Sequence, residues 1–419
     1  MDGPKPDWKH AHPAQSGNSP SPSLVYALCG LAGLVEGFDL QSGGMAAPRF
    51  AAEFHMAPDH VGLIFLLTSL GLALGASIGG WLGDRVGSGR AMGAAITLFG
   101  LANIGSALAT SETALFIARG VVGLGLGGTL PNMIALLTAT GPAATAPRRV
   151  TLSIAGISVG SLIVGLIAFL AKQVSWRMMF HLGGWIPLLV GAIVWLLLPH
   201  ATRSTRFYSV QDDQPGERWR ALFGGPRLLV TLFFWFAFFV TTATAYLLIN
   251  WMPTFLAHSG MDQHQVGLGM IGLSIGAAVG PALLAGLLRP GRTVPIICLA
   301  YGGIMLGLLL VINAPASPLY LSFAIGFTGF FSAGAQAVLY GIVGPFYPDA
   351  ARGSGVGSSV AVGRIGSGVG PALAGVMLTA GLSQNRVLAA AIPMLIVALG
   401  ALLVLFRHPP AALRGQRDV

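Results

Sequence analysis

The sequence predicts an all-α membrane protein whose twelve transmembrane helices form two bundles of six. Hydrophobic residues occupy 54% of the 419 positions and charged residues only 9%. This composition is typical of polytopic membrane proteins rather than of soluble enzymes. Twelve apolar runs of roughly 20 residues are each long enough to cross the ~30 Å hydrocarbon layer as a helix. The one long polar segment between them, at 199–227, divides the runs into six and six.

The expected spans and domains follow from these runs. The spans lie near 24–47, 59–82, 91–110, 113–138, 149–171, 178–198, 228–253, 266–288, 294–312, 318–342, 355–380 and 387–406. The eleventh is so rich in glycine that hydropathy should score it weakly. The predicted domains are a disordered cytoplasmic tail (1–22), an N-terminal six-helix bundle (23–198), a cytoplasmic linker (199–227), a C-terminal six-helix bundle (228–406) and a cytoplasmic tail (407–419).

The basic residues predict the orientation. With the N-terminus inside, most of the 23 Lys and Arg residues fall in cytoplasmic segments, as the positive-inside rule requires. We therefore expect an integral protein of the bacterial inner membrane, embedded in lipid as a monomer, with both termini in the cytoplasm. The net charge of +9 is scattered over short loops, so no nucleic-acid groove is predicted.

A weak internal repeat relates the bundles by a pseudo-two-fold axis along the membrane normal, which is one plan of secondary transporters. The alignment that matches Arg149 with Arg352 also matches Ser161 with Arg364, and it sets threonines of the seventh span opposite acids of the first. Proton chemistry is therefore expected in the N-terminal half and an anion contact in the C-terminal half.

Two carboxylates stand inside the first span. Glu36 and Asp39 lie about 18 to 22 Å from its cytoplasmic end at roughly 1.5 Å per residue, near the membrane midplane. Their i,i+3 spacing favours one helix face, and an ionised acid facing lipid at that depth costs ~2.5–3.5 kcal/mol. The pair is therefore expected to face protein or a water-filled cavity. Arg119 and Arg364 are the other embedded charges, and the four sum to zero.

Two motifs concern gating and helix packing. The loop GGWLGDRVGSGR after the second span, with Asp84, Arg85 and Arg90, resembles the cytoplasmic gating loop of the major facilitator superfamily, but lacks its usual basic residues at Ser88 and Gly89. The fourth span reads RGVVGLGLGGTLPN from Arg119, which resembles the second signature of that superfamily. If the superfamily arrangement holds, Arg119 lies at about the depth of Asp39.

Polar and aromatic side chains recur on two C-terminal spans. Tyr246 and Asn250 form an i,i+4 pair in the seventh span, and Gln336 and Tyr340 form another in the tenth. Such groups can hold an aromatic ring and its hydroxyls by stacking and hydrogen bonding. They equally suit contacts between helices or anchoring at the membrane interface, and the sequence leaves both readings open.

The eleventh span surrounds Arg364 with glycines and serines, GVGSSVAVGRIGSG. These small residues leave room for a ligand beside the guanidinium, whose fork fits a carboxylate with two parallel hydrogen bonds. The structural alternative is a fixed ion pair with Glu36 or Asp39.

Four segments carry a more specific resemblance: EGFDLQ at 36–41, LPNMIAL at 130–136, YLLINWMP at 246–253 and AVGR at 361–364. They are similar to the aromatic acid/proton symporter family, and within it to the hydroxyphenylpropionate importers. The resemblance implies proton-driven uptake of an aromatic carboxylate, of the hydroxyphenylpropionate or hydroxybenzoate type, for aromatic hydrocarbon catabolism. It implies proton coupling by Asp39 and Glu36, a coupling or gating role for Arg119, and substrate recognition by Arg364.

Other functions stay open as alternatives. Within transport these are import of another organic acid, such as a dicarboxylate, or proton-coupled efflux. A membrane enzyme needs a nucleophile with a base, or a metal cluster, at one depth, and the sequence has neither. A receptor would usually carry a large soluble extension. The two cysteines, Cys29 and Cys298, stand alone in apolar runs, so no disulfide, metal site or cofactor is expected.

Overall fold

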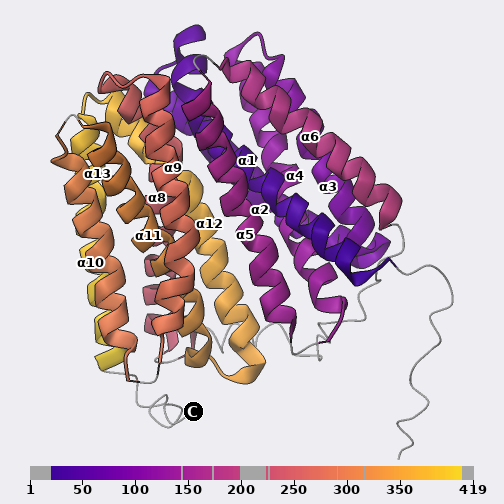
Figure 1. The fold of residues 1–419 in the computed structure, drawn as a ribbon. Helices are drawn as coiled ribbons and strands as arrows, with labels where there is room; N and C mark the ends of the chain where they lie inside the picture. Colours follow the sequence, from indigo (N-terminus) through magenta and orange to yellow (C-terminus); the bar gives the residue numbers. More distant parts are fainter. Residues whose placement is uncertain are drawn as a thin grey trace, which may run out of the picture.

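The computed structural model describes residues 20–142, 145–171, 174–198, 223–224, 227–289, 291–315 and 317–407. The predicted tails and the linker lie almost wholly outside these ranges. Twelve long helices make up the bundle in the described residues (Figure 1): α1 (Pro22–Glu53), α2 (Pro58–Val86), α3 (Ser88–Ala107), α4 (Glu112–Ala139), α5 (Ala146–Leu170), α6 (Trp176–Leu197), α8 (Arg227–His258), α9 (Gln263–Leu287), α10 (Thr293–Ile312), α11 (Pro318–Val343), α12 (Asp349–Thr379) and α13 (Gln384–Arg407).

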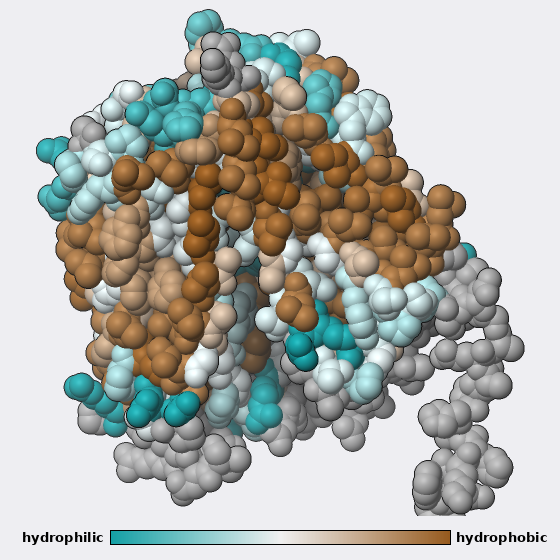
Figure 2. Space-filling model, viewed as in Figure 1, coloured by the Kyte–Doolittle hydropathy of each residue, from teal (hydrophilic) through white to brown (hydrophobic). Residues whose placement is uncertain are grey.

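The expected spans agree with these helices to within a few residues at most ends. Eleven of the twelve are long and apolar enough to cross a membrane. The exception is α3. The glycine-rich α12 passes with a hydropathy of 1.3, which no other of the eleven spans falls below, so the expectation of a weak eleventh span is confirmed. Figure 2 shows why the bundle suits a bilayer, because an apolar belt covers most of the visible flank and polar residues gather at its two ends.

Side chains and prolines fix where several helices begin. The hydroxyl groups of Ser21, Ser111, Ser175 and Ser317 each accept a hydrogen bond from a backbone N–H in the first turn of α1, α4, α6 and α11. At α9, Asp262 and Gln265 form a reciprocal capping box. Proline occupies the first turn of α1, α2, α5 and α11, where no backbone N–H is needed. These signals place the turns on the two polar faces of the bundle.

The contacts divide the helices into an N-half, α1–α6, and a C-half, α8–α13. In the N-half α1 packs on α5, α2 on α4, and α3 on α4 and α6; in the C-half α8 packs on α12, α9 on α11, and α10 on α11 and α13. Each pair in one half therefore has its counterpart six helices later. Between the halves, α2 meets α12 and α5 meets α9, which exchange under the same operation. This is the pseudo-two-fold relation that the sequence repeat predicts.

Glycines let helices within a half approach closely. At Gly37 of α1 a Cβ would overlap the backbone of Ile157 in α5, and at Gly160 of α5 a Cβ would overlap the backbone of Leu34 in α1. Both positions lie beside the first-span acids. The segment that carries Glu36 and Asp39 is thus held directly against α5.

The halves meet most closely at one end of the bundle. We define the terminal end as the end where α1 begins and α13 finishes, and the far end as the opposite one, with Glu53 and Gln384. At the far end, the Asp59 N–H donates to the Thr379 hydroxyl (3.0 Å), joining α2 to α12. The His264 ring stacks on Phe169, with centroids 4.0 Å apart, joining α9 to α5.

A third far-end contact links α1 to α9. The Gln263 Oε1 accepts hydrogen bonds from Arg49 Nη2 at 2.5 Å and from the Val174 N–H at 3.2 Å. In the view of Figure 2, a hollow between the halves opens toward the lower, terminal end. The halves are therefore closed together at the far end and separated toward the terminal end.

Candidate transport site

A bidentate ion pair lies inside the N-half. Arg119 of α4 donates from Nη1 to Asp39 Oδ1 (3.1 Å) and from Nη2 to Asp39 Oδ2 (3.2 Å). Asp39 is 0% exposed and Arg119 4% exposed. The depth argument from the sequence therefore holds for this pair, since the two side chains meet across the bundle. A parallel two-bond contact of this kind fixes geometry as well as charge.

Asn103 of α3 completes the cluster, and the sequence analysis did not identify it. Its amide Nδ2 donates to Asp39 Oδ1 (2.7 Å) and to the Gly183 carbonyl of α6 (3.1 Å), while its Oδ1 accepts from Arg119 Nη1 (3.0 Å). The only available signal was an isolated amide in an apolar span. We call Asp39, Arg119 and Asn103 the buried triad.

The surroundings of the triad fit the arginine closely. The guanidinium carbon lies 5.1 Å from the ring centroid of Phe180 in α6, a cation–π distance. On its other side, a Cβ at Gly43 of α1 would stand 3.2 Å from Nη2. A larger residue at 43 would therefore crowd the arginine.

Arg364 of α12 lies in the C-half and differs from Arg119 in its partners. Its Nη1 donates to the Tyr246 hydroxyl of α8 at 3.3 Å. Tyr246, Tyr340 of α11 and Glu36 are the groups that act on it electrostatically. Within the described part of the chain no ion pair joins Arg364 to an acid. The fixed ion pair that the sequence left open is therefore not formed here.

Glu36 and Asp39 have different neighbours, although their spacing predicted a shared face. Three residues of helix leave an offset of about 60°, which turns Asp39 toward Arg119. Glu36 is 3% exposed, and its Oε2 is buried without a hydrogen-bond partner in the described structure. The charged groups acting on Glu36 are Arg364 and Asp39. Of the two acids, it is Glu36 that is associated with the C-half.

The other expected C-half residues are brought together only in part. Gln336 Nε2 donates to the Thr242 hydroxyl at 3.2 Å, joining α11 to α8. Tyr340 is 45% exposed and packs edge-on against Phe238, with centroids 5.3 Å apart. Asn250, one turn after Tyr246 on α8, is 7% exposed, and its backbone lies against Gly44 of α1. The structure thus groups Tyr246, Tyr340 and Arg364, with Gln336 bonded to the same helix, α8.

The predicted gating residues lie at the terminal end, between α2 and α3. Asp84, Arg85 and Arg90 are all exposed, and the Arg85 guanidinium lies 4.0 Å from the Trp81 ring centroid. Asp84 makes no ion pair with any residue that the structure describes. Gly89 is buried against Leu198, where a side chain would overlap the backbone, so the basic residue usual at this place would not fit here.

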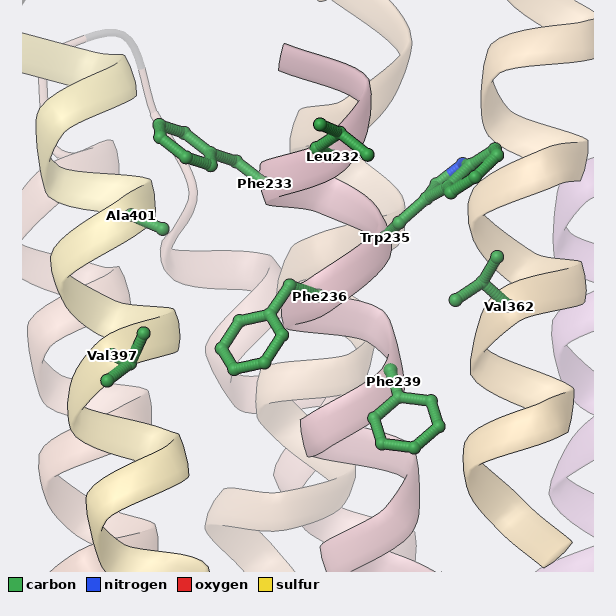
Figure 3. A pocket seen from close by; sticks show the side chains of 8 residues that line it. All are labelled: Leu232, Phe233, Trp235, Phe236, Phe239, Val362, Val397 and Ala401. Carbon is green, nitrogen blue, oxygen red and sulfur yellow. The ribbon is translucent and has the colours of Figure 1, made fainter. Parts of the chain in front are cut away.

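A separate apolar pocket of about 480 Å³ lies on the flank of the C-half. Figure 3 shows side chains of α8 directed between α12 and α13; the lining residues are Leu232, Phe233, Trp235, Phe236, Phe239, Val362, Val397 and Ala401. None of the predicted site residues lines it. Its walls offer almost only carbon, so it does not suit a carboxylate.

Comparison with curated proteins shows consistent relatives. The chain is 36% identical over 375 residues to the 3-(3-hydroxy-phenyl)propionate transporter of Escherichia coli, covering 90% of this chain and 92% of the relative. It is 28% identical to a gallate transporter of Pseudomonas putida, over 86% of each chain. It is 26% identical to a 4-hydroxybenzoate transporter of Pseudomonas aeruginosa, over 89% of this chain and 90% of the relative.

Solved structures match the fold. A bacterial homologue of the human lysosomal transporter Spinster has a TM-score of 0.73 at 17% identity, covering 93% of this chain and 98% of that one. The nucleoside transporter NupG also has a TM-score of 0.73, at 14% identity, covering 91% and 100%. The family model of the Major Facilitator Superfamily matches residues 29–326 and 256–418. The chain is therefore an integral membrane transport protein, not an enzyme, and it belongs to the Major Facilitator Superfamily and, within it, to the aromatic acid transporters.

Proposed function

We propose that this protein imports an aromatic carboxylate, of the hydroxyphenylpropionate or hydroxybenzoate type, together with protons by alternating access. The named substrates of its relatives support an aromatic acid. The basic residues of the loops support an inner-membrane location with both termini in the cytoplasm. In that orientation the terminal end faces the cytoplasm, and the closed far end faces outward.

The observation that carries the proposal is Arg364, a cation of the C-half that has no acidic partner among the residues that the structure describes. Arg364 has one hydrogen bond, to Tyr246, and leaves most of its fork free among the described residues. A substrate carboxylate can occupy that fork with two charge-assisted bonds. The exposed ring of Tyr340 and the Tyr246 hydroxyl then offer contacts for the aromatic part of the substrate. Gln336 is within one helical turn of Tyr340 and supplies an amide.

Charge balance supports proton coupling. The ion pair of Asp39 with Arg119 is neutral, and Glu36 balances Arg364. A bound carboxylate adds one negative charge to this set, and a proton taken up by an acid of the first span restores neutrality. Entry of an anion against a negative-inside potential is opposed by ~2.3 kcal/mol per charge per 100 mV, so a proton is needed for accumulation.

The gating residues suit an open terminal end. When the far-end contacts break, the halves are expected to close at the terminal end. Asp84, which has no ion-pair partner among the described residues, is expected to find one there. A loop with only Arg90 behind it makes a weaker closure than the fuller motif.

Uptake into proteoliposomes tests the proposal. Proteoliposomes that contain the wild-type protein are expected to accumulate 3-(3-hydroxyphenyl)propionate under an inward proton gradient. At equal pH on both sides they are expected to exchange it. Asp39→Asn is expected to lose accumulation and keep exchange; Glu36→Gln is expected to behave likewise if Glu36 carries a proton, and to show only weaker affinity if it lines the cavity. Glu112→Gln is the control, because Glu112 contacts His60 at the far end and not the triad.

Two results would contradict the proposal. Full accumulation by the Asp39→Asn/Glu36→Gln double variant would exclude proton coupling through these acids. Strong competition by an aliphatic dicarboxylate, with none by aromatic acids, would favour the other organic-acid importers instead.

A further inference from the structure

Asn103 uses its whole amide inside the N-half. It is 0% exposed, and its two N–H groups and its oxygen contact α1, α6 and α4. The partners fix which way the amide points. Turned over, its oxygen would face Asp39 Oδ1 and the Gly183 carbonyl, and its NH₂ would face the Arg119 cation. The Asn103 amide therefore links Asp39 to Arg119 in one fixed orientation.

The amide makes the two oxygens of Asp39 unequal. Oδ1 accepts from Asn103 and from Arg119 Nη1, whereas Oδ2 accepts only from Arg119 Nη2 among the described residues. A proton that binds Oδ2 therefore displaces one hydrogen bond, whereas a proton that binds Oδ1 displaces two. The neutral acid then attracts Arg119 less, while Oδ1 stays bonded to Asn103 and Arg119 Nη1 stays bonded to the amide oxygen.

We propose that Asn103 is a positioning residue for proton coupling: it holds Asp39 Oδ1 so that a proton taken at Oδ2 releases Arg119 in the same step. This rests on the proposed proton symport. Asn103 also tethers the released guanidinium, so the ion pair can form again when the proton leaves. A neutral residue does this without adding a charge to a set that already balances.

The groups that titrate or carry charge near Asp39 are few, and each is on a named element. Arg119 lies on α4 and pairs with Asp39, and Glu36 lies on α1, the helix of Asp39 itself. Arg364 lies on α12 and acts on Glu36. The adjoining α6 carries His181, whose Nδ1 is buried without a partner in the described structure. Asn103 is itself neutral, so its replacement can change the pH response only through the charged groups around it.

The test compares Asn103→Leu, which keeps the branched shape without the amide, and Asn103→Ala, which avoids crowding by the bulkier leucine, with Ser106→Ala. Ser106 is a matched control, because it is 0% exposed on the same helix and its hydroxyl bonds only the Ala102 carbonyl in the described structure. Exchange and gradient-driven accumulation of 3-(3-hydroxyphenyl)propionate are measured from pH 5 to 9. Thermal unfolding of each purified variant is measured alongside.

We expect both Asn103 variants to keep exchange within about threefold of wild type, to lose accumulation by about tenfold, and to shift the pH midpoint of exchange upward by about one unit, because the ionised Asp39 loses a buried donor. The Ser106→Ala profile is expected to match wild type. If the Asn103 variants unfold more easily but match Ser106→Ala in accumulation and pH profile, the inference about Asn103 is wrong and the proposed symport stands. Wild-type protein that fails to accumulate substrate under a proton gradient overturns it together with the proposed symport.

Discussion

Replacing Arg364 with lysine separates the charge of this site from its geometry. The Arg364 guanidinium donates one hydrogen bond to the Tyr246 hydroxyl at 3.3 Å and has no acidic partner in the described residues. Lysine keeps the charge but offers a carboxylate a point contact instead of a fork. The variant is therefore expected to lose one of two charge-assisted hydrogen bonds to substrate.

The size of the loss follows from that bond. A hydrogen bond to a charged group contributes about 1.5–3 kcal/mol, so the dissociation constant should rise roughly 10- to 150-fold. Arg364→Ala loses both bonds and the charge, and specific binding should disappear. Tyr246→Phe removes only the hydroxyl that positions the arginine, so its loss should be smaller than that of Arg364→Lys.

Equilibrium binding of 3-(3-hydroxyphenyl)propionate to purified protein measures these losses without transport. Arg386→Lys is the control, because Arg386 is exposed in the first turn of α13 at the far end, whereas Tyr340 lies in the last turn of α11 at the terminal end. If Arg364→Lys bound like wild type, and Arg364→Ala bound at all well, Arg364 would be a structural residue. The aromatic carboxylate would then have to be recognised elsewhere.

Two further changes test the movement between states. Asp84→Asn is expected to slow turnover several-fold with little change in affinity, because Asp84 is exposed at the terminal end and remote from the cavity; the rate and the affinity are read from uptake at varied substrate concentration. Gln263→Ala is expected to loosen the far end, because it removes an acceptor shared by Arg49 and the Val174 N–H, and about 2 kcal/mol would shift the populations roughly 30-fold. Labelling of Ala168→Cys, a buried position in α5, by an impermeant maleimide reports that opening.

Each of these tests has its own check. Asp84→Asn with a normal rate and weakened affinity would place Asp84 in binding rather than gating. For the far end, Gln384→Ala is the control, since the Gln384 amide bonds Ser259 within the C-half. Equal labelling of Ala168→Cys in the Gln263→Ala and Gln384→Ala backgrounds would show that the Gln263 contacts do not hold the halves together.

The sequence predicts the helices well because length and hydropathy are local properties. The halves also follow, since the polar segment at 199–227 separates two runs of six. Hydropathy is weakest as a guide for α3, which falls short of a membrane span, and for α12, which passes with a low value. Serine, asparagine and many small residues lower the apolarity of α3, which nonetheless packs between α4 and α6. In α12 the apolar residues between the glycines suffice.

The candidate site is predictable only where charge marks it. Asp39 and Arg119 stand out because embedded charges are costly, and their shared depth follows from the rise per residue. Asn103 carries no such mark, and its role depends on the side chains that α1, α4 and α6 bring to it. The different neighbours of Glu36 and Asp39 depend on the rotation of α1, which spacing leaves undetermined.

The glycine contacts between α1 and α5 limit which substitutions this protein can accept. Because backbone atoms occupy the space a side chain would need at Gly37 and at Gly160, even a methyl group there forces the helices apart. The seam between the halves combines two kinds of contact. At Gly62 and Gly375 a Cβ would press on backbone atoms of the opposite half, whereas the Thr379 hydroxyl bonds the Asp59 carboxylate through side chains that can be replaced. Tolerated substitutions are therefore expected to gather at the side-chain contacts of the seam and on the lipid-facing flank, while the glycine crossings of both kinds stay fixed. Related transporters that carry different aromatic acids would then differ at side-chain contacts of the seam and in the cavity, and they would share the α1–α5 crossing.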